Sequence, residues 1–229
     1  GQKLIERKRC VPTPAGKRLY ERALGILANV ESAVKEVKDF DDAATQSLRA
    51  GAGDTTALYI LPSVLQTFSR AMPNARVMLV NRPTTSLVEM VLRGNLDIAI
   101  VTLPLHHVEL DSNDVCEEQL VAVAPRGHRL ANRRTLALSD LSKEPILLLD
   151  PNTRTGTILT DFFRDHSFTP MVLLESGSFE VIKRYVATGL GIAFLPEIAL
   201  TASDKGIVKL AVRGLPVVRL GAIWRRQTY

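Results

Sequence analysis

Hydroxyl side chains occur at four places where this sequence is expected to pass from a strand towards a helix. These places are Thr55–Thr56, Thr84–Thr85, Thr102 and Ser178. A helix N-terminus presents unpaired backbone N–H groups and the positive end of the helix dipole, so it attracts an anion. For any one of these residues, capping its own helix is the favoured role. If several of them meet in one cleft, however, they form a site of neutral donors for a carboxylate or an inorganic oxyanion.

No arrangement typical of an enzyme stands out. The sequence lacks the Gly-x-Ser-x-Gly, Gly-x-x-x-x-Gly-Lys and His-Glu-x-x-His motifs. His106 and His107 are adjacent, and neighbours on an extended segment point to opposite faces, which favours a solvated loop over a metal site. Cys116 has no second cysteine nearby and is interpreted as a small strand residue rather than a redox sensor. We predict no enzymatic activity, no cofactor and no metal ion.

Positive charge is concentrated at one end of the chain. Residues 1–38 hold nine Lys and Arg against four Glu, a net charge of +5, and the whole chain is also +5. The remaining residues therefore balance at zero. This distribution is typical of an arm held near phosphate, with a solvated basic tail as the alternative. We predict that Lys8 and Arg9 contact DNA.

Length and composition indicate an ordinary globular protein of one or two domains. The 229 residues are 46% hydrophobic and 23% charged, and no apolar run approaches the roughly 18 residues of a membrane span. The segment Gly1–Arg9 has no apolar signal region. Cys10 and Cys116 lie far apart, so a reducing compartment fits better than a disulfide. These features predict a cytoplasmic protein that does not enter a membrane.

Apolar strand patterns alternate with helical patterns along most of the chain. Strands are expected at residues 48–53, 75–80, 96–101, 120–124, 146–149, 171–174, 191–195, 207–212 and 217–224. Helices are expected between them, at residues 58–70, 87–92, 155–166 and 178–187. This alternation predicts a doubly wound α/β architecture in two lobes of similar build.

A long amphipathic helix is predicted from Pro14 to Phe40, ahead of these lobes. Pro14 suits a first helical position, and Thr13 is an acceptable N-cap. Apolar residues recur along it at alternating spacings of about three and four, as in a coiled coil: Leu19, Ala23, Ile26, Val30, Ala33, Val37 and Phe40. So wide a stripe needs a partner, which is either the protein's own body or the same helix of a second copy. We favour the second copy.

The residues around the start of this helix resemble a known family. Leu4–Arg7 followed by Pro12–Gly16 is similar to the end of the DNA-binding domain of LysR-type transcriptional regulators. That family usually has Leu-Phe-x-Arg in the wing and Leu-Thr-x-Ala-Gly at the start of a dimerising linker helix. This chain departs from the pattern at Ile5 and Pro12, both mild changes.

Motifs in the body extend the resemblance over essentially the whole chain. They are Leu61–Pro62, Phe68 with Pro73, Gly94–Ala99 and Gly189–Pro196, each weak alone but in the family's order and spacing. The resemblance implies a periplasmic-binding-protein type 2 fold. Residues 1–13 would be a remnant of a winged helix-turn-helix, and 14–47 the linker helix and hinge. Residues 48–124 and 206–229 would form lobe I, and 125–205 lobe II.

The resemblance also implies a function, a binding site and partners. A small-molecule effector would bind between the lobes and shift their arrangement, and the linker helices would pass that shift to promoter DNA. The predicted effector-binding residues are Thr55, Thr56, Thr84, Thr85, Thr102, Ser178 and Phe179. The predicted dimerisation residues are Leu19, Ala23, Ile26, Val30 and Val37. Partners would be a second copy in a dimer or tetramer, promoter DNA, the effector and, as a further candidate, RNA polymerase.

Two other classes remain as alternatives. An extracytoplasmic solute-binding protein of a transport system has the same fold, but it needs a signal peptide and has no use for a self-associating basic helix. An enzyme with paired lobes, similar to prephenate dehydratase, needs a charged catalytic set in the cleft, where this sequence offers hydroxyl groups.

Overall fold

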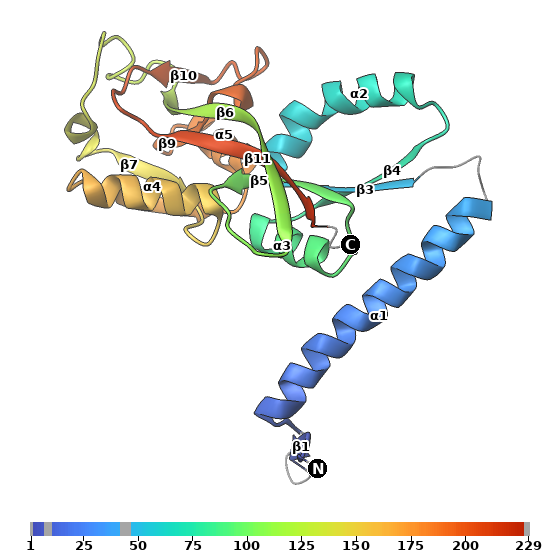
Figure 1. Cartoon of the computed structure of the whole chain (residues 1–229). Coiled ribbons are helices and arrows are strands. Elements are labelled where there is room, and N and C mark those ends of the chain that lie inside the picture. The colour runs from blue at the N-terminus through green and yellow to red at the C-terminus, as the bar shows by residue number, and fades with distance from the viewer. Residues whose placement is uncertain (1, 7–10, 42–46, 227–229) are drawn as a thin grey trace.

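A long helix stands apart from a mixed α/β body in the computed structural model of the chain (Figure 1). The structure describes residues 2–6, 11–41 and 47–226. Within the long helix it describes the side chains of residues 14–20, 22–27, 30 and 34. The predicted sites Lys8 and Arg9 lie outside the described residues, as does the side chain of Val37.

The long helix, α1, confirms the helix predicted from Pro14 and runs over Pro14–Asp41. Two short strands precede it: β1 (Ile5–Glu6) pairs antiparallel with β2 (Val11–Pro12). Thr13 Oγ1 accepts a hydrogen bond from Gly16 N at 3.1 Å, the N-cap bond expected at this position. The paired strands β1 and β2 thus lead into α1 through a helix start that Thr13 caps.

Lobe I is built on three parallel strands with two antiparallel strands added at one side. The strands are β3 (Ser47–Ala52), β4 (Arg76–Asn81), β5 (Ile98–Leu103), β6 (Leu110–Pro125) and β11 (Val217–Arg225). β3 lies between β4 and β5, and β11 joins β5 to β6. The helices are η1 (Thr56–Ile60, a π-helical segment), α2 (Leu61–Ala71) and α3 (Thr84–Leu92). The apolar face of α3 packs on buried residues of β5.

Lobe II repeats the parallel arrangement with β7 (Pro145–Leu149) between β8 (Met171–Ser176) and β9 (Ile192–Pro196). The helices α4 (Arg154–Asp165) and α5 (Phe179–Ala187) follow β7 and β8, as expected for doubly wound units. α5 is followed by Gly189 at φ +91°, a backbone conformation that favours glycine. Short 3₁₀ turns cover Leu138–Leu141 and Glu197–Ala199, and β10 (Ile207–Leu210) pairs with β6.

The strand β6 connects the two lobes. Its residues 110–119 pair with β11, and its residues 120–123 pair with β9. The sequence predicted a strand only from Leu120, because the first half of β6 is largely exposed and therefore polar. The predicted division of the chain at 124/125 and 205/206 stays a prediction, and the strand changes partner between Gln119 and Leu120.

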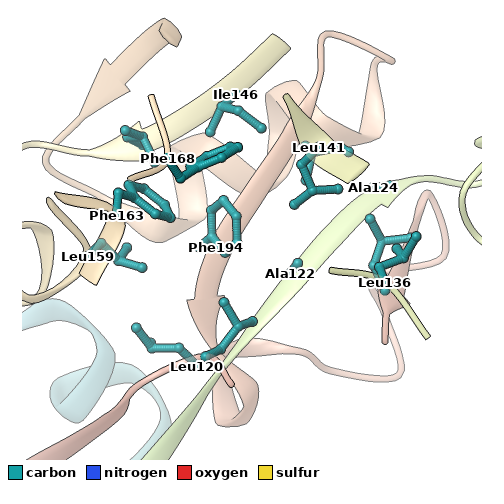
Figure 2. Close-up of a cluster of buried hydrophobic side chains, with 14 of the residues drawn as sticks. Leu120, Ala122, Ala124, Leu136, Leu141, Ile146, Leu159, Phe163, Phe168 and Phe194 are labelled. Carbon is teal, nitrogen blue, oxygen red and sulfur yellow. The ribbon is translucent and has the colours of Figure 1, made fainter. Parts of the chain in front are cut away.

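The largest apolar cluster lies under α4 (Figure 2). Phe194 of β9 is fully buried, and its ring centroid lies 5.1 Å from that of Phe163 on α4. The ring centroids of Phe168 and Phe163 lie 5.3 Å apart. Edge-on aromatic contacts of this kind stabilise a core beyond the area they bury. They hold α4 against β9, and the start of α4 reaches the site described next.

Candidate functional site

A cavity of about 130 Å³ lies where the carboxyl ends of strands from both lobes meet. In open α/β sheets ligands bind at this end of the strands. Its lining from lobe I is Gly53, Asp54, Thr55, Thr56, Asn81, Arg82, Pro83, Thr84, Ile100, Val101, Thr102, Glu118, Val218 and Leu220. Its lining from lobe II is Leu149, Thr153, Arg154, Thr155, Gly177, Phe179 and Pro196.

The structure brings five of the seven predicted effector-binding residues to this cavity. They are Thr55, Thr56, Thr84, Thr102 and Phe179. The other two predicted residues do not line it: Thr85 is exposed on α3, and Ser178 is half-buried just before α5. The lining of this cavity therefore includes hydroxyl groups from three strand ends of lobe I.

The hydroxyl groups of Thr55, Thr84 and Ser178 make no capping hydrogen bond. Thr55 and Ser178 hold N-cap positions, yet neither side chain makes a capping hydrogen bond. Thr84 lies inside its helix, after the N-cap Pro83, and its Oγ1 accepts a long bond of 3.5 Å from Thr102 N. By contrast, Thr153 Oγ1 accepts from Gly156 N at 3.1 Å and caps α4. Because capping does not hold them, the hydroxyls of Thr55 and Thr84 can turn towards a ligand.

Two guanidinium groups join the neutral donors, which the sequence interpretation did not anticipate. Arg82 follows β4, and Arg154 begins α4. Arg154 also donates to the carbonyl oxygen of Pro104 at 3.0 Å, a hydrogen bond from lobe II to lobe I. A fixed positive charge at each side of the cavity strengthens its preference for an anion.

Two carboxyl groups, Asp54 and Glu118, balance these cations. Burial raises the pKa of Glu118, and the nearby charge of Glu197 raises it further. A raised carboxyl pKa means that the neutral form is more accessible at Glu118 than at an ordinary glutamate. The balance of charge in the cavity therefore depends on pH.

The start of α4 is a further part of the site that the sequence pattern was not used to predict. Thr153 is the N-cap of α4, and Arg154 and Thr155 are its first residues, so they lie at the same kind of strand-to-helix junction as the four chosen places. Gly156 allows this turn to form, since a Cβ there would collide with the carbonyl of Asp150. The same pattern, hydroxyl residues where a strand passes into a helix, is visible in the sequence at Asn152–Thr157.

The predicted dimerisation residues do not pack on the body where the structure describes them. Leu19 is 52% exposed, Ile26 62% and Val30 54%, while Ala23 is half-buried. Figure 1 shows α1 extending away from the α/β body. The described part of the apolar stripe of α1 is thus open to a partner.

Neither a membrane helix nor a metal cluster is found in the parts of the chain that the structure covers. Among residues 2–6, 11–41 and 47–226, no helix is both long enough and apolar enough to cross a membrane. The same residues contain no group of three or more His, Cys, Asp or Glu placed to hold a metal ion.

Comparison with known proteins identifies the family. Residues 41–229 match the LysR substrate binding domain. The HTH-type transcriptional regulator CfxR of Cupriavidus necator is 29% identical over 210 residues, covering 91% of this chain and 66% of that protein. CbbR of Xanthobacter flavus is 30% identical over 215 residues, covering 91% of this chain and 63% of that protein. The chain therefore spans slightly less than two thirds of the length of these relatives.

A solved structure supports the fold. The regulatory domain of CcmR from Synechocystis PCC6803, solved in complex with 2-PG, has a TM-score of 0.74 at 24% identity. The likeness covers 80% of this chain and 89% of that one. The fold is the mixed α/β fold of LysR effector-binding domains, which is of the periplasmic-binding-protein type 2 kind, as predicted. The relatives CfxR and CbbR are transcriptional regulators, so the solute-binding alternative is not favoured. Because the match covers residues 41–229, the chain belongs to the LysR-type family of transcriptional regulators and contains its substrate-binding domain.

Proposed function

We propose that this chain senses a small anion or carboxylate in the cavity between its lobes and controls transcription in response. The observation that carries this proposal is the composition of the cavity: hydroxyls of Thr55, Thr84 and Thr102 together with Arg82 and Arg154, contributed by both lobes. Hydrogen bonds between such donors and an ionised ligand are among the stronger polar contacts in proteins. The apolar remainder of the lining suits a small organic body.

The ligand would act by favouring one arrangement of the lobes. Because the cavity is lined from both lobes, a ligand that contacts both binds better when they are close. The related CcmR domain was solved with 2-PG, which makes 2-PG a reasonable first compound to test.

The remaining parts of the proposal concern assembly and DNA. Leu19, Ala23, Ile26, Val30 and Val37 would pack against the same helix of a second copy, giving a dimer or tetramer. Lys8 and Arg9 would contact phosphates of promoter DNA. The regulator would act in the cytoplasm, with RNA polymerase as a further candidate partner.

Calorimetric titration of the full chain tests the effector proposal. The compounds are sulfate, 2-PG, and the pair benzoate and benzamide, which share a ring but differ in charge. We expect an anion to bind and benzamide to bind less well than benzoate. Thr84→Val and Thr102→Val should each weaken the affinity for the anion roughly ten- to a hundredfold, the equivalent of about 1.5–3 kcal/mol.

Thr85→Val is the matched control, because Thr85 is adjacent to Thr84 but does not line the cavity. Its affinity should equal that of the unaltered chain, and the thermal melting of all three variants should stay close to normal. Equal binding of benzoate and benzamide would contradict an anion site. Melting that drops in Thr84→Val while affinity holds would show that the hydroxyl is structural.

A further inference from the structure

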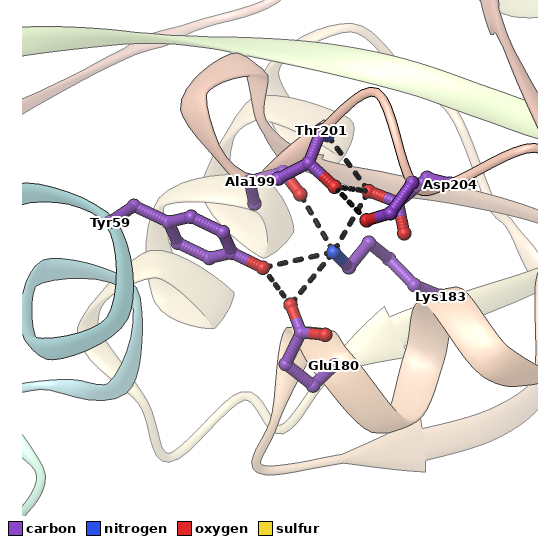
Figure 3. A network of polar contacts seen from close by, with 7 residues as sticks. Tyr59, Glu180, Lys183, Ala199, Thr201 and Asp204 are labelled. Atoms are coloured by element: carbon purple, nitrogen blue, oxygen red, sulfur yellow. Dashed lines mark hydrogen bonds and ion pairs between the residues drawn. The ribbon is translucent and has the colours of Figure 1, made fainter.

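A buried lysine lies where η1 of lobe I meets α5 of lobe II (Figure 3). Lys183 is only 4% exposed. Its Nζ donates to Tyr59 Oη at 2.9 Å, to Ala199 O at 2.8 Å and to Asp204 Oδ2 at 3.1 Å. It also pairs with Glu180 Oε1 at 2.8 Å. Removing a charge from water is costly unless it is paired and hydrogen-bonded, and this ammonium group has four partners.

Tyr59 is the member of this cluster that lobe I contributes. Its hydroxyl donates to Glu180 and accepts from Lys183. Its ring centroid lies 5.3 Å from Lys183 Nζ, and the ring packs against the apolar cluster that includes Ile182 and Val186 of α5. One side chain of lobe I is therefore held by a carboxylate, a cation and an apolar face of lobe II.

The charges of the cluster support one another. Burial would lower the pKa of Lys183, but hydrogen bonds with Glu180, Tyr59 and Asp204 outweigh it and hold the pKa above the usual range. Burial would raise the pKa of Asp204, but hydrogen bonds from Thr201 and Lys183 hold it below its usual value. Burial, followed by the bond to Glu180, raises the pKa of Tyr59, so its hydroxyl stays a donor near neutral pH.

The contact across the lobes can open without leaving the buried charge unpaired. If Tyr59 moves away, Lys183 keeps Glu180, Asp204 and the carbonyl of Ala199, all of lobe II. A hollow of about 340 Å³ lined by Tyr59 and the same charged residues is large enough for water to replace the tyrosine hydroxyl. Opening the contact therefore exchanges the tyrosine hydroxyl for water at Lys183 and Glu180 and leaves the ion pairs of lobe II in place, which suits a reversible element.

Both sides of this contact begin at the candidate effector cavity. Thr55 and Thr56 line the cavity and lead into η1, which carries Tyr59 three residues later. Phe179 lines the cavity from lobe II and directly precedes Glu180. A π-helical segment such as η1 is a form of helix often found at functional sites. The Tyr59 contact is thus adjacent along the chain to both walls of the cavity.

We infer that Tyr59 and Lys183 form an interlobe latch, a reversible contact that holds η1 against α5 and favours the lobe arrangement seen in this structure. Tyr59 acts as a positioning residue, because it holds η1 against α5, and Thr55 and Thr56 lie at the start of η1. Lys183 contributes to the latch through the hydrogen bond that its Nζ donates to the Tyr59 hydroxyl. The latch depends only on contacts between the lobes, so it can be tested without knowing which ligand fills the cavity.

Distance measurement between spin labels on the two lobes tests the latch directly. Labels are attached through Gln66→Cys on α2 and Asp165→Cys at the end of α4, both exposed, in a full chain that carries Cys10→Ser and Cys116→Ser. Labelled chain is diluted with excess unlabelled chain, so that pairs between copies do not contribute. The unaltered latch should give one dominant interlobe distance. Tyr59→Phe, which keeps the ring but removes both hydroxyl contacts, should add a second, longer-distance population.

Tyr185→Phe is the matched control, because Tyr185 lies on α5 and is 44% exposed. It should leave the distance distribution unchanged. A hydroxyl with a merely structural role would lower the melting temperature in Tyr59→Phe without changing the distance between the lobes. A distribution in Tyr59→Phe that matches the unaltered chain would therefore overturn the latch, whatever happens to melting.

Discussion

The helices α1 and α5 are both amphipathic and have opposite surroundings. In α5 the apolar residues Phe179, Ile182 and Val186 are buried against the sheet of lobe II. In α1 the equivalent residues, such as Ile26 and Val30, remain more than half exposed. An apolar stripe is stable in water only when something covers it. This difference shows that an apolar pattern predicts that a helix face is covered. It does not identify the covering surface, which can belong to the same chain or to another copy.

Charged substitutions in the two helices should have opposite consequences, and this is the largest effect we expect. Ile182→Asp places a carboxylate at a fully buried position, which costs several kcal/mol, a large share of a typical domain stability of about 5–15 kcal/mol. Chemical unfolding should show loss of the folded body. The double change Ile26→Asp and Val30→Asp should leave that unfolding transition nearly unchanged.

The α1 double variant should instead change assembly. Because Ile26 and Val30 would face the same helix of a second copy, two carboxylates there should separate the copies. Sedimentation velocity should show a monomer where the unaltered chain is a dimer or larger. If the double variant stayed assembled, the stripe of α1 would not be the dimer contact, and the comparison with α5 would lose its basis.

The N-terminal segment, residues 1–38, and the rest of the chain also differ in net charge. DNA binding by the N-terminal segment should therefore depend on the salt concentration. Residues 1–38 carry a net charge of +5, whereas the rest of the chain balances at zero. Lys8→Ala and Arg9→Ala should each weaken binding to any duplex DNA and reduce the salt dependence by about one unit on a logarithmic plot. Lys143→Ala, an exposed change on the body, is the control and should have little effect. Loss limited to one DNA sequence would make Lys8 or Arg9 a base reader.

The sequence predicted those features of the structure whose residue pattern lies within a few neighbouring positions. The helix α1, the alternation of strands and helices, and the hydroxyls at strand ends all follow from spacing within a few residues. The first half of β6 was missed because it is exposed and therefore lacks the apolar pattern of a buried strand. The π-helical form of η1 has no simple residue signature, and the sequence interpretation described it as part of an ordinary helix.

Contacts between distant residues could not be predicted from one sequence. Tyr59 and Lys183 are separated by 124 residues, and neither stands out in its own segment. Arg82 and Glu118 look like ordinary surface charges until β4 and β6 bring them to the same cavity. The start of α4 is different, since Thr153–Thr155 could have been chosen by the rule that found Thr55.

The smallest effect that we expect distinguishes two causes of anion binding: individual charged side chains at the cavity, and the net charge of the body. The body has no net charge with which to attract an anion, so its preference must come from groups at the cavity: Arg82 and Arg154 against Asp54 and Glu118. Of these, Glu118 has a pKa that burial, and then Glu197, raise above the usual value. As pH falls through that raised pKa, Glu118 becomes neutral and stops repelling an anion. Affinity for sulfate, whose own charge stays constant in this range, should therefore increase.

The variant Glu118→Gln isolates this carboxylate. It should bind sulfate more tightly than the unaltered chain above the pKa of Glu118, by a few-fold, and its affinity should vary less with pH. Glu117→Gln is the matched control, because Glu117 is exposed and neighbouring residues of a strand point to opposite faces. It should keep the full pH dependence. If Glu118→Gln kept that dependence as well, the cavity would not be where sulfate binds, and the contrast between a charged arm and a selectively lined body would need another explanation.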